Sequence, residues 1–272
     1  MAIPLEDNYD DVLLKAFQGL KLKPADVAAR TNLDVGAITR VLAGDFDETV
    51  VRQLAPVLGL GTEALIALGR RAYAPHVSPP DGMRGFSTPY HDFFVNAYLL
   101  WDESTKQAVI FDTGSDGEAL LEAVRDRGLQ VELLLITHAH PDHVMGLDFL
   151  RKSTGARAFV SSREPLAGAE SLAAGETFQV GELTIKPLPT SGHSVGGTSY
   201  FVTGLSKPVV VVGDALFAAS MGRGNVSYPD ALANNRREIF TLPDETVIAP
   251  GHGPLTSVGL EKRHNPFYPE LA

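Results

Sequence analysis

The sequence predicts an α/β domain preceded by a small all-α domain. Apolar residues recur at helical spacing through residues 1–70, an alanine- and leucine-rich stretch. From residue 86 onward, short β-branched runs alternate with segments of helical character. Residues 71–85 contain Pro75, Pro79 and Pro80, a composition that favours neither helix nor strand. The expected organisation is therefore a helical domain at 1–70, a linker at 71–85 and an α/β domain at 86–272.

Composition limits the classes of function. The 272 residues are 44% hydrophobic and 21% charged, which suits a globular chain with a full core. No apolar run approaches the roughly 18 residues of a membrane span, and MAIPLEDNYDD lacks the features of a secretory signal, so we expect a cytoplasmic protein. The absence of cysteine excludes disulfides and thiolate chemistry. A net charge of −10 disfavours broad binding to nucleic acids or anionic membranes.

Helices are expected at residues 25–30, 34–42, 50–58 and 62–68 of the first domain. Pro24 suits a first helical turn, Asp34 suits an N-cap, and Gly44 would end the third segment. This pattern resembles the helix-turn-helix domain of phage-repressor type, with 25–30 and 34–42 as the paired helices.

The charge of this domain nevertheless disfavours DNA binding. Residues 1–70 carry seven basic and ten acidic side chains, and the candidate recognition helix offers only Thr39 and Arg40 to DNA. A role in packing, dimerisation or covering a substrate pocket is favoured instead. We expect a homodimer with contacts through or near residues 1–70.

The first half of the α/β domain leads to a cluster of histidines. Strands are expected at 93–101 and 108–111, the second ending at Asp112, and a helix at 117–127 that Gly128 stops. The continuous apolar run 131–136 is typical of a strand buried on both faces. It leads directly into the segment Thr137-His138-Ala139-His140-Pro141-Asp142-His143. Imidazoles and a carboxylate in so small a volume predict a site for zinc, with iron or manganese as alternatives.

Three later strands also lead to a histidine or an aspartate that could bind a metal. The strand at 183–188 leads to His193, the strand at 208–212 to Asp214, and the strand at 246–249 to His252. Each polar side chain falls in a turn with glycine, where the backbone can approach a metal closely.

These motifs together resemble the metallo-β-lactamase superfamily over residues 86–272. The resemblance implies an αββα sandwich and two divalent metal ions. It assigns His138, His140 and His193 to one metal and Asp142, His143 and His252 to the other, with Asp214 bridging. Asp112 would orient a ligand histidine, although such an aspartate can also serve only as a turn cap.

The finer resemblance is to glyoxalase II-like hydrolases. It rests on residues 213–217 with Gly222 and Arg223, on Pro250-Gly251-His252-Gly253-Pro254, and on residues 261–267. The C-terminal helical domain that supplies thiol-binding cations in that group has no counterpart before Ala272, and the N-terminal helical domain is additional. The resemblance therefore implies the fold and metal site but not a glutathione thioester substrate.

The predicted activity is hydrolysis of an ester, thioester or lactone by a metal-bound hydroxide. Asp142 would also accept the proton of the nucleophile. Arg223 could bind a substrate carboxylate, and Tyr90, His91 and Tyr228 are candidates for the pocket wall.

Two other functions stay open. A mononuclear iron dioxygenase acting on a persulfide would use His138, His193 and Asp214. A metal-dependent DNA-binding regulator would instead use the helical domain to read DNA. Hydrolysis of β-lactams is disfavoured, because that activity is secreted and a signal peptide is not visible.

Overall fold

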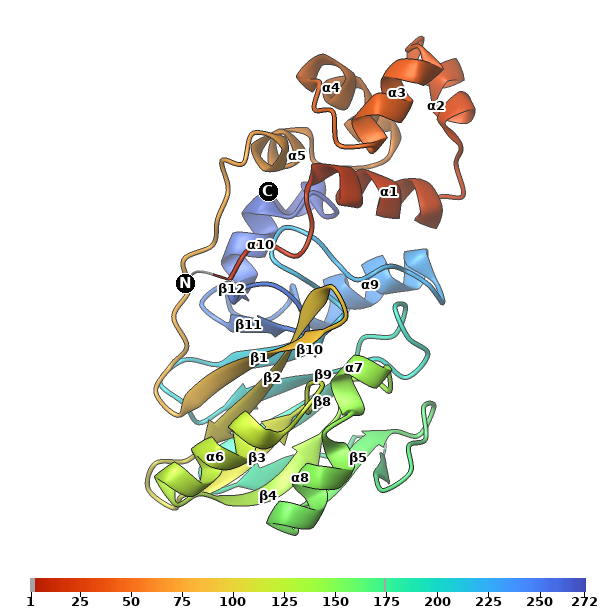
Figure 1. Ribbon diagram of the computed structural model, residues 1–272. Coiled ribbons are helices and arrows are strands. Elements are labelled where there is room, and N and C mark those ends of the chain that lie inside the picture. Colours follow the sequence, from red (N-terminus) through yellow and green to blue (C-terminus); the bar gives the residue numbers. More distant parts are fainter. Residues whose placement is uncertain (1–2, 174) are drawn as a thin grey trace.

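The chain forms a layered α/β domain with a cap of helices on one side (Figure 1). The structure is a computed structural model that describes residues 3–173 and 175–272. The cap consists of α1 (Tyr9–Gly19), α2 (Pro24–Thr31), α3 (Val35–Leu42), α4 (Glu48–Val57) and α5 (Thr62–Gly69). No helix within the described residues is both long and apolar enough to cross a bilayer.

Within the described residues the α/β domain contains two sheets of six strands each. The first sheet, in spatial order, is β1 (Met83–Tyr90), β2 (Phe93–Trp101), β3 (Gln107–Phe111), β4 (Gln130–Leu135), β5 (Arg157–Ser161) and β6 (Glu170–Leu172). The second is β12 (Thr256–Ser257), β11 (Val247–Pro250), β10 (Val209–Gly213), β9 (Thr198–Thr203), β8 (Leu183–Pro189) and β7 (Phe178–Val180). Strand β3 pairs in parallel with β4, and β10 with β11, so the carboxyl ends of each pair lie at one edge.

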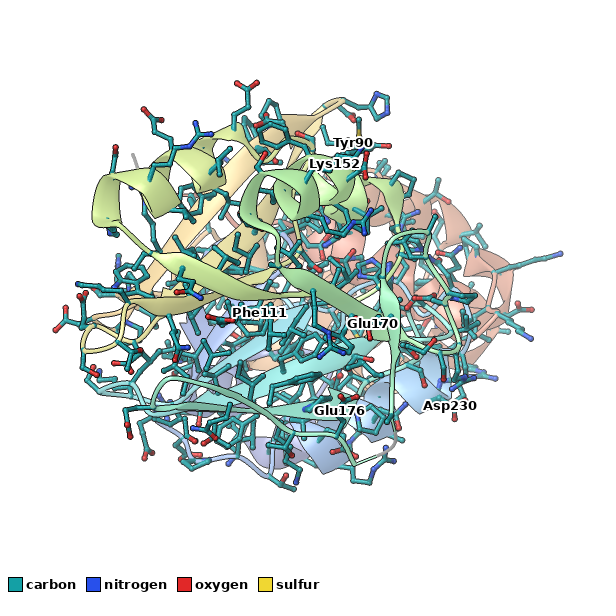
Figure 2. The ribbon with its side chains drawn as sticks, turned by 90° about the horizontal axis from the view of Figure 1, so that it is seen from below. Tyr90, Phe111, Lys152, Glu170, Glu176 and Asp230 are labelled. Atoms are coloured by element: carbon teal, nitrogen blue, oxygen red, sulfur yellow. The ribbon has the colours of Figure 1, made fainter. Side chains whose placement is uncertain are left out.

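Helices cover the outer faces of both sheets. The first sheet is covered by α6 (Glu118–Arg127) and α8 (Leu147–Thr154), with the single-turn α7 (Pro141–Val144) before α8. The second is covered by α9 (Tyr228–Glu238), α10 (Val258–His264) and the short η1 (Pro269–Leu271). Figure 2 shows Phe111 between the sheets and Lys152 on the outer helices. The predicted αββα arrangement is therefore confirmed.

The alternation of side chains along strands creates the separate cores. In β10, Val209 and Val211 belong to the core between the sheets, whereas Val210 and Val212 belong to the core beneath the helices. Successive strand residues point to opposite faces, so a strand covered on both sides must be apolar throughout. This explains the continuous apolar run in the sequence.

The N-terminal helices pack on the α/β domain rather than standing apart from it. Leu13 and Leu65 share one buried core with Phe267 and Tyr268. The main-chain nitrogen of Gly61 donates a hydrogen bond of 2.7 Å to the carbonyl oxygen of Pro266. The helical domain therefore shares the core on the outer face of the second sheet with α9, α10 and η1 (Figure 1).

Most predicted elements form within one or two residues of their expected ends. Asp34 caps α3 by accepting a hydrogen bond from the main chain of Ala37, and Gly128 ends α6 with φ of 61°. Strand β1, which was not predicted, begins at Met83, inside the range assigned to the linker. Its sequence includes Gly85 and Pro89, which strands usually avoid, so no strand pattern marks it.

Candidate metal centre

All seven predicted ligand residues meet at one edge of the two sheets. His138 follows β4, Asp214 follows β10 and His252 follows β11, so the parallel strands deliver them to the same edge. Donor atoms lie within 4.8 Å of one another in three overlapping groups: His138, His140 and His193; His138, His143 and Asp214; Asp142, His143 and His252.

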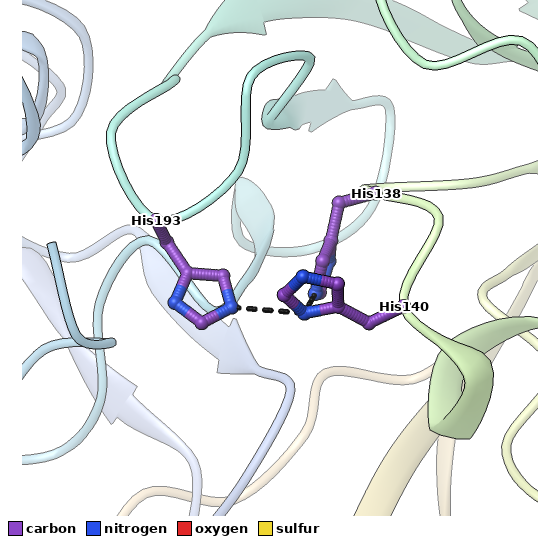
Figure 3. A group of neighbouring side chains, drawn as sticks. All are labelled: His138, His140 and His193. Atoms are coloured by element: carbon purple, nitrogen blue, oxygen red, sulfur yellow. Dashed lines mark hydrogen bonds between the residues drawn. The ribbon is translucent and has the colours of Figure 1, made fainter. Parts of the chain in front are cut away.

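The first group consists of three imidazoles (Figure 3). Nδ1 of His140 lies 3.0 Å from Nε2 of His138 and 3.1 Å from Nε2 of His193. An imidazole nitrogen carries either one proton or one lone pair, so Nδ1 of His140 can form a good hydrogen bond with only one of these two nitrogens. A shared cation removes this conflict, and three imidazoles are a common ligand set for zinc.

The second group combines imidazoles with a carboxylate. Oδ2 of Asp142 lies 3.5 Å from Nε2 of His143 and 3.4 Å from Nε2 of His252. Asp214 faces both groups, because its Oδ2 lies 3.4 Å from Nε2 of His193 and its Oδ1 lies 3.3 Å from Nε2 of His143.

Two atoms in the middle of this arrangement lack a hydrogen-bonding partner. They are Nε2 of His143 and Oδ1 of Asp214, which are buried and lie 3.3 Å apart, but neither makes a hydrogen bond among the residues that the structure describes. A buried polar atom without a partner costs about 1–3 kcal/mol. A divalent cation would supply the missing partner for both atoms, so the donor set fits a metal.

Main-chain carbonyls fix the orientation of two imidazoles. Nδ1 of His252 donates to the carbonyl oxygen of Phe94 at 2.6 Å, and Nδ1 of His193 donates to that of Arg223 at 2.9 Å. A carbonyl oxygen can only accept, so the proton of each ring is on Nδ1. In the neutral form of each ring, Nε2 therefore presents a lone pair to the centre, as a metal ligand requires.

Asp112 orients two further imidazoles from beneath the centre. Its Oδ2 accepts a hydrogen bond from Nδ1 of His143 at 2.8 Å. It also accepts from the hydroxyl of Thr137 at 2.8 Å, and that hydroxyl lies 3.0 Å from Nδ1 of His138. Asp112 adopts φ of 53°, a left-handed conformation that aspartate tolerates. Asp112 therefore lies where a carboxylate that orients ligand histidines was expected.

Burial and neighbouring charges shift the pKa values of the histidines in opposite directions. Burial lowers the pKa of His138 well below its usual value, and the nearby His143 adds to this effect. Burial also opposes the charged form of His143, but Asp112 and Asp214 raise its pKa to about 10. The pKa of His252 is likewise raised to about 11, mainly by Asp214, against the effect of burial. Without a metal, the buried carboxylates therefore hold protons on these two rings, and a metal must displace them.

Two supporting residues differ in how visible they are in the sequence. Glu164, after β5, accepts hydrogen bonds from the main chains of Ala139 at 3.2 Å and Val195 at 3.1 Å, and so ties two ligand loops together. Gly251 provides space, because a Cβ there would lie 2.3 Å from Oδ1 of Asp214. No motif identifies Glu164, whereas the glycine beside His252 was a visible signal.

The predicted substrate residues fare differently. The side chain of Arg223 is exposed, while its carbonyl holds His193. Tyr228 is buried against Gly19 of α1 and Gly224, so its expected place in the pocket wall is wrong. Tyr90 and His91 lie where β1 turns into β2, with their rings 4.5 Å apart.

Comparison with known proteins agrees with this geometry. The chain is 32% identical over 196 residues to the probable metallo-hydrolase YqgX of Bacillus subtilis, covering 63% of this chain and 91% of the relative. It is 28% identical over 204 residues to the hydroxyacylglutathione hydrolase GloC of Haemophilus influenzae, covering 66% of this chain and 95% of the relative. The solved structure of ETHE1 from Myxococcus xanthus is similar, with a TM-score of 0.61, 30% identity, and coverage of 69% of this chain and 85% of that chain.

A family model described as the metallo-beta-lactamase superfamily matches residues 91–252, which is more than half of the chain. The matched range ends at His252 and includes every predicted ligand, while α1 to α5 lie outside it. The chain therefore belongs to the metallo-beta-lactamase superfamily.

Proposed function

We propose that the chain is a metal-dependent hydrolase that cleaves an ester, thioester or lactone with two divalent cations. One observation carries the proposal: Asp214 directs its two carboxylate oxygens to two different groups of ligand atoms. A carboxylate so placed can bridge two metals. The names of the relatives, a metallo-hydrolase and a hydroxyacylglutathione hydrolase, support hydrolysis.

The proposed ligand sets follow the two groups. One cation takes His138, His140 and His193, and the other takes Asp142, His143 and His252, with Asp214 shared. All donors are nitrogen or oxygen, which favours zinc and also accommodates iron or manganese.

Bound at this edge, two divalent cations would lower the pKa of water toward neutrality and polarise the substrate carbonyl. The residues of the chain orient the reaction. Oδ2 of Asp142 lies between the rings of His143 and His252, where it can accept a proton as the nucleophile forms. The exposed guanidinium of Arg223, beside the His193 loop, is the proposed site for a carboxylate on the substrate.

The alternative of a mononuclear iron dioxygenase acting on a persulfide uses fewer of these residues. It requires only His138, His193 and Asp214 as ligands. That choice leaves the buried Nε2 of His143 without a hydrogen bond or a metal, 3.3 Å from Oδ1 of Asp214. Two cations satisfy this atom, so the geometry favours the hydrolase.

Elemental analysis and a substrate panel test the proposal on protein purified without chelators. We expect two equivalents of metal per chain and turnover of at least one ester, thioester or lactone without oxygen consumption. Asp214→Ala should lose turnover and metal while staying folded, because the cations then repel each other without a bridge. Asp126→Ala, an exposed change on α6, is the matched control.

Two results would contradict the proposal. One is the absence of a stoichiometric transition metal. The other is a single iron per chain together with oxygen uptake on a persulfide substrate, which would identify the dioxygenase.

A further inference from the structure

The segment that precedes α1 borders the metal centre. Gly253 directly follows His252, and a Cβ built on Gly253 would lie 3.1 Å from the main-chain nitrogen of Glu6 and 3.4 Å from its Cβ. The chain therefore brings Glu6 of its N-terminal segment against the loop that carries a proposed metal ligand.

A cavity of about 560 Å³ opens at this contact. It is lined by residues 3–6, by Ser87 and residues 92–94 of the β1–β2 hairpin, and by Gly253. We call it the N-terminal cleft. A cavity of this volume can hold a small organic group.

The cleft and the metal centre share a wall. The ring of Phe93 lies 5.3 Å from the ring of His252, edge to face, and the carbonyl oxygen of Phe94 fixes the same imidazole. The cleft therefore lies directly beside the imidazole of a proposed metal ligand.

The lining of the cleft is acidic and aromatic. Among the described residues that line it, Glu6 and Asp92 are the charged ones, and none is lysine, arginine or histidine. The aromatic residues are Phe93 and Phe94, and the Phe94 side chain is 58% exposed. A carboxylate beside aromatic rings is the usual environment for a cationic group, and quaternary ammonium ions in particular.

Of the two carboxylates, Glu6 is the better placed to pair with a cation in the cleft. Its side chain is half-buried and has no hydrogen-bond or ion-pair partner among residues 3–173 and 175–272. The nearby Lys15 is already engaged by Asp7 and by the carbonyl of Met221. Burial raises the pKa of Glu6, although His252 and Lys15 act in the opposite direction. A cation in the cleft would supply this carboxylate with the ion-pair partner that the described residues do not provide.

We propose that the N-terminal cleft binds a cationic, partly apolar group of the substrate, and that Glu6 is the residue that determines this specificity. The proposal rests on the proposed hydrolase function, because it assigns the other end of the substrate to the metals. It also gives the N-terminal segment a direct part in substrate selection.

Three butyryl thioesters that differ in the charge of the thiol test the proposal. The thiols are thiocholine, which is cationic, 3,3-dimethylbutanethiol, its neutral isostere, and 3-mercaptopropanoate, which is anionic. Thiol release can be followed with a thiol reagent, because the chain contains no cysteine. We expect kcat/KM to favour the cationic ester over its neutral isostere by about tenfold, with the anionic ester slowest.

Two variants in the cleft and one control locate the charge that selects the substrate. Glu6→Gln keeps the shape of the side chain and should lower the cationic-to-neutral ratio by about fivefold. Glu245→Gln makes the same change of charge at an exposed position before β11, at the opposite end of that strand from His252, and should leave the ratio unchanged. Asp92→Asn, at an exposed site, provides a second test from the other wall of the cleft and should lower the ratio less.

A binding measurement separates this proposal from the proposed function. The butyl thioether of thiocholine cannot be hydrolysed, and calorimetry on metal-loaded protein should show weaker binding for Glu6→Gln than for the wild type. If binding depends on Glu6 but no ester is hydrolysed, the proposed hydrolase function is rejected and cation binding in the N-terminal cleft is supported. Equal kcat/KM for the cationic and neutral esters, or an unchanged ratio and unchanged thioether affinity in folded, metal-loaded Glu6→Gln, would overturn the proposal.

Discussion

Nζ of Lys15, on α1, lies 2.8 Å from the carbonyl oxygen of Met221 and donates a hydrogen bond to it. Met221 belongs to the loop between Asp214 and α9. Lys15 also pairs with Asp7, which accepts a hydrogen bond of 2.5 Å from the hydroxyl of Ser220 in the same loop. The helical domain thus supports the loop that carries the proposed bridging ligand.

Lys15→Met should be strongly destabilising. Lys15 is 8% exposed, and its removal leaves Asp7 as a buried carboxylate without its counter-charge. Breaking a buried ion pair from one side costs about 3–5 kcal/mol in the free energy of unfolding. Urea denaturation measures the loss, with the exposed Lys207→Met as control. The double variant with Asp7→Asn should recover part of the stability, and a Lys15→Met protein as stable as the control would show that the pair contributes nothing.

Asp112→Asn should weaken metal binding without unfolding the chain. An amide offers one acceptor oxygen in place of two, so it cannot serve the ring of His143 and both donors of Thr137. Loss of a residue that orients metal ligands lowers affinity by about 10- to 100-fold. Competition with a chromogenic chelator measures the affinity. Asp116→Asn, whose side chain caps the main chain of Glu118, is the control, and equal affinities in the two variants would reject the role of Asp112.

The sequence predicts where several proposed ligands lie, because these residues directly follow strands. A buried parallel strand is visible as an apolar run, and its carboxyl end fixes where the next polar side chain lies. His138, Asp214 and His252 could therefore be placed at one edge before the structure was known. Their chemistry required only that histidine and aspartate occur at those ends.

The supporting contacts could not be predicted in this way. The carbonyl of Phe94 holds a ring 158 residues away in the sequence, and backbone acceptors have no residue identity to detect. Glu6 has no pattern at all, because its position depends on how the helical domain packs on the second sheet. That packing is a property of tertiary contacts between segments far apart, which local periodicity does not report.

The homodimer stays a prediction, and the helical domain offers a surface for it. Leu14 and Leu20 of the α1 region are 42% and 40% exposed, and Val35 of α3 is 44% exposed. We expect sedimentation to show a dimer, and Leu14→Lys to weaken it, because a lysine in an apolar contact must be desolvated. Phe149→Lys, at a 41% exposed site on α8, is the control. A wild-type chain that is monomeric at high protein concentration would exclude this dimer.

Glu261, on α10, gives the fold a dependence on pH. The carboxyl is fully buried and accepts hydrogen bonds from Thr256 at 2.7 Å, Asn265 at 2.9 Å and the main chain of Ala219 at 2.9 Å. Burial nevertheless outweighs these bonds and raises its pKa from 4.5 to about 7. The folded chain therefore holds this proton more tightly than the unfolded chain does.

The sign of the effect on stability follows from this difference in pKa. The contribution of Glu261 is fully present below pH 4.5 and is lost as the pH rises through about 7, where the buried carboxyl ionises. Glu261→Gln removes the titration. The free energy of unfolding of the wild type, relative to this variant, should therefore fall by about 3 kcal/mol between pH 4.5 and pH 8. Urea denaturation of both proteins across this range measures the difference, with the exposed Glu182→Gln as control. A difference that stays constant with pH would mean that Glu261 keeps the same charge in the folded and unfolded chains.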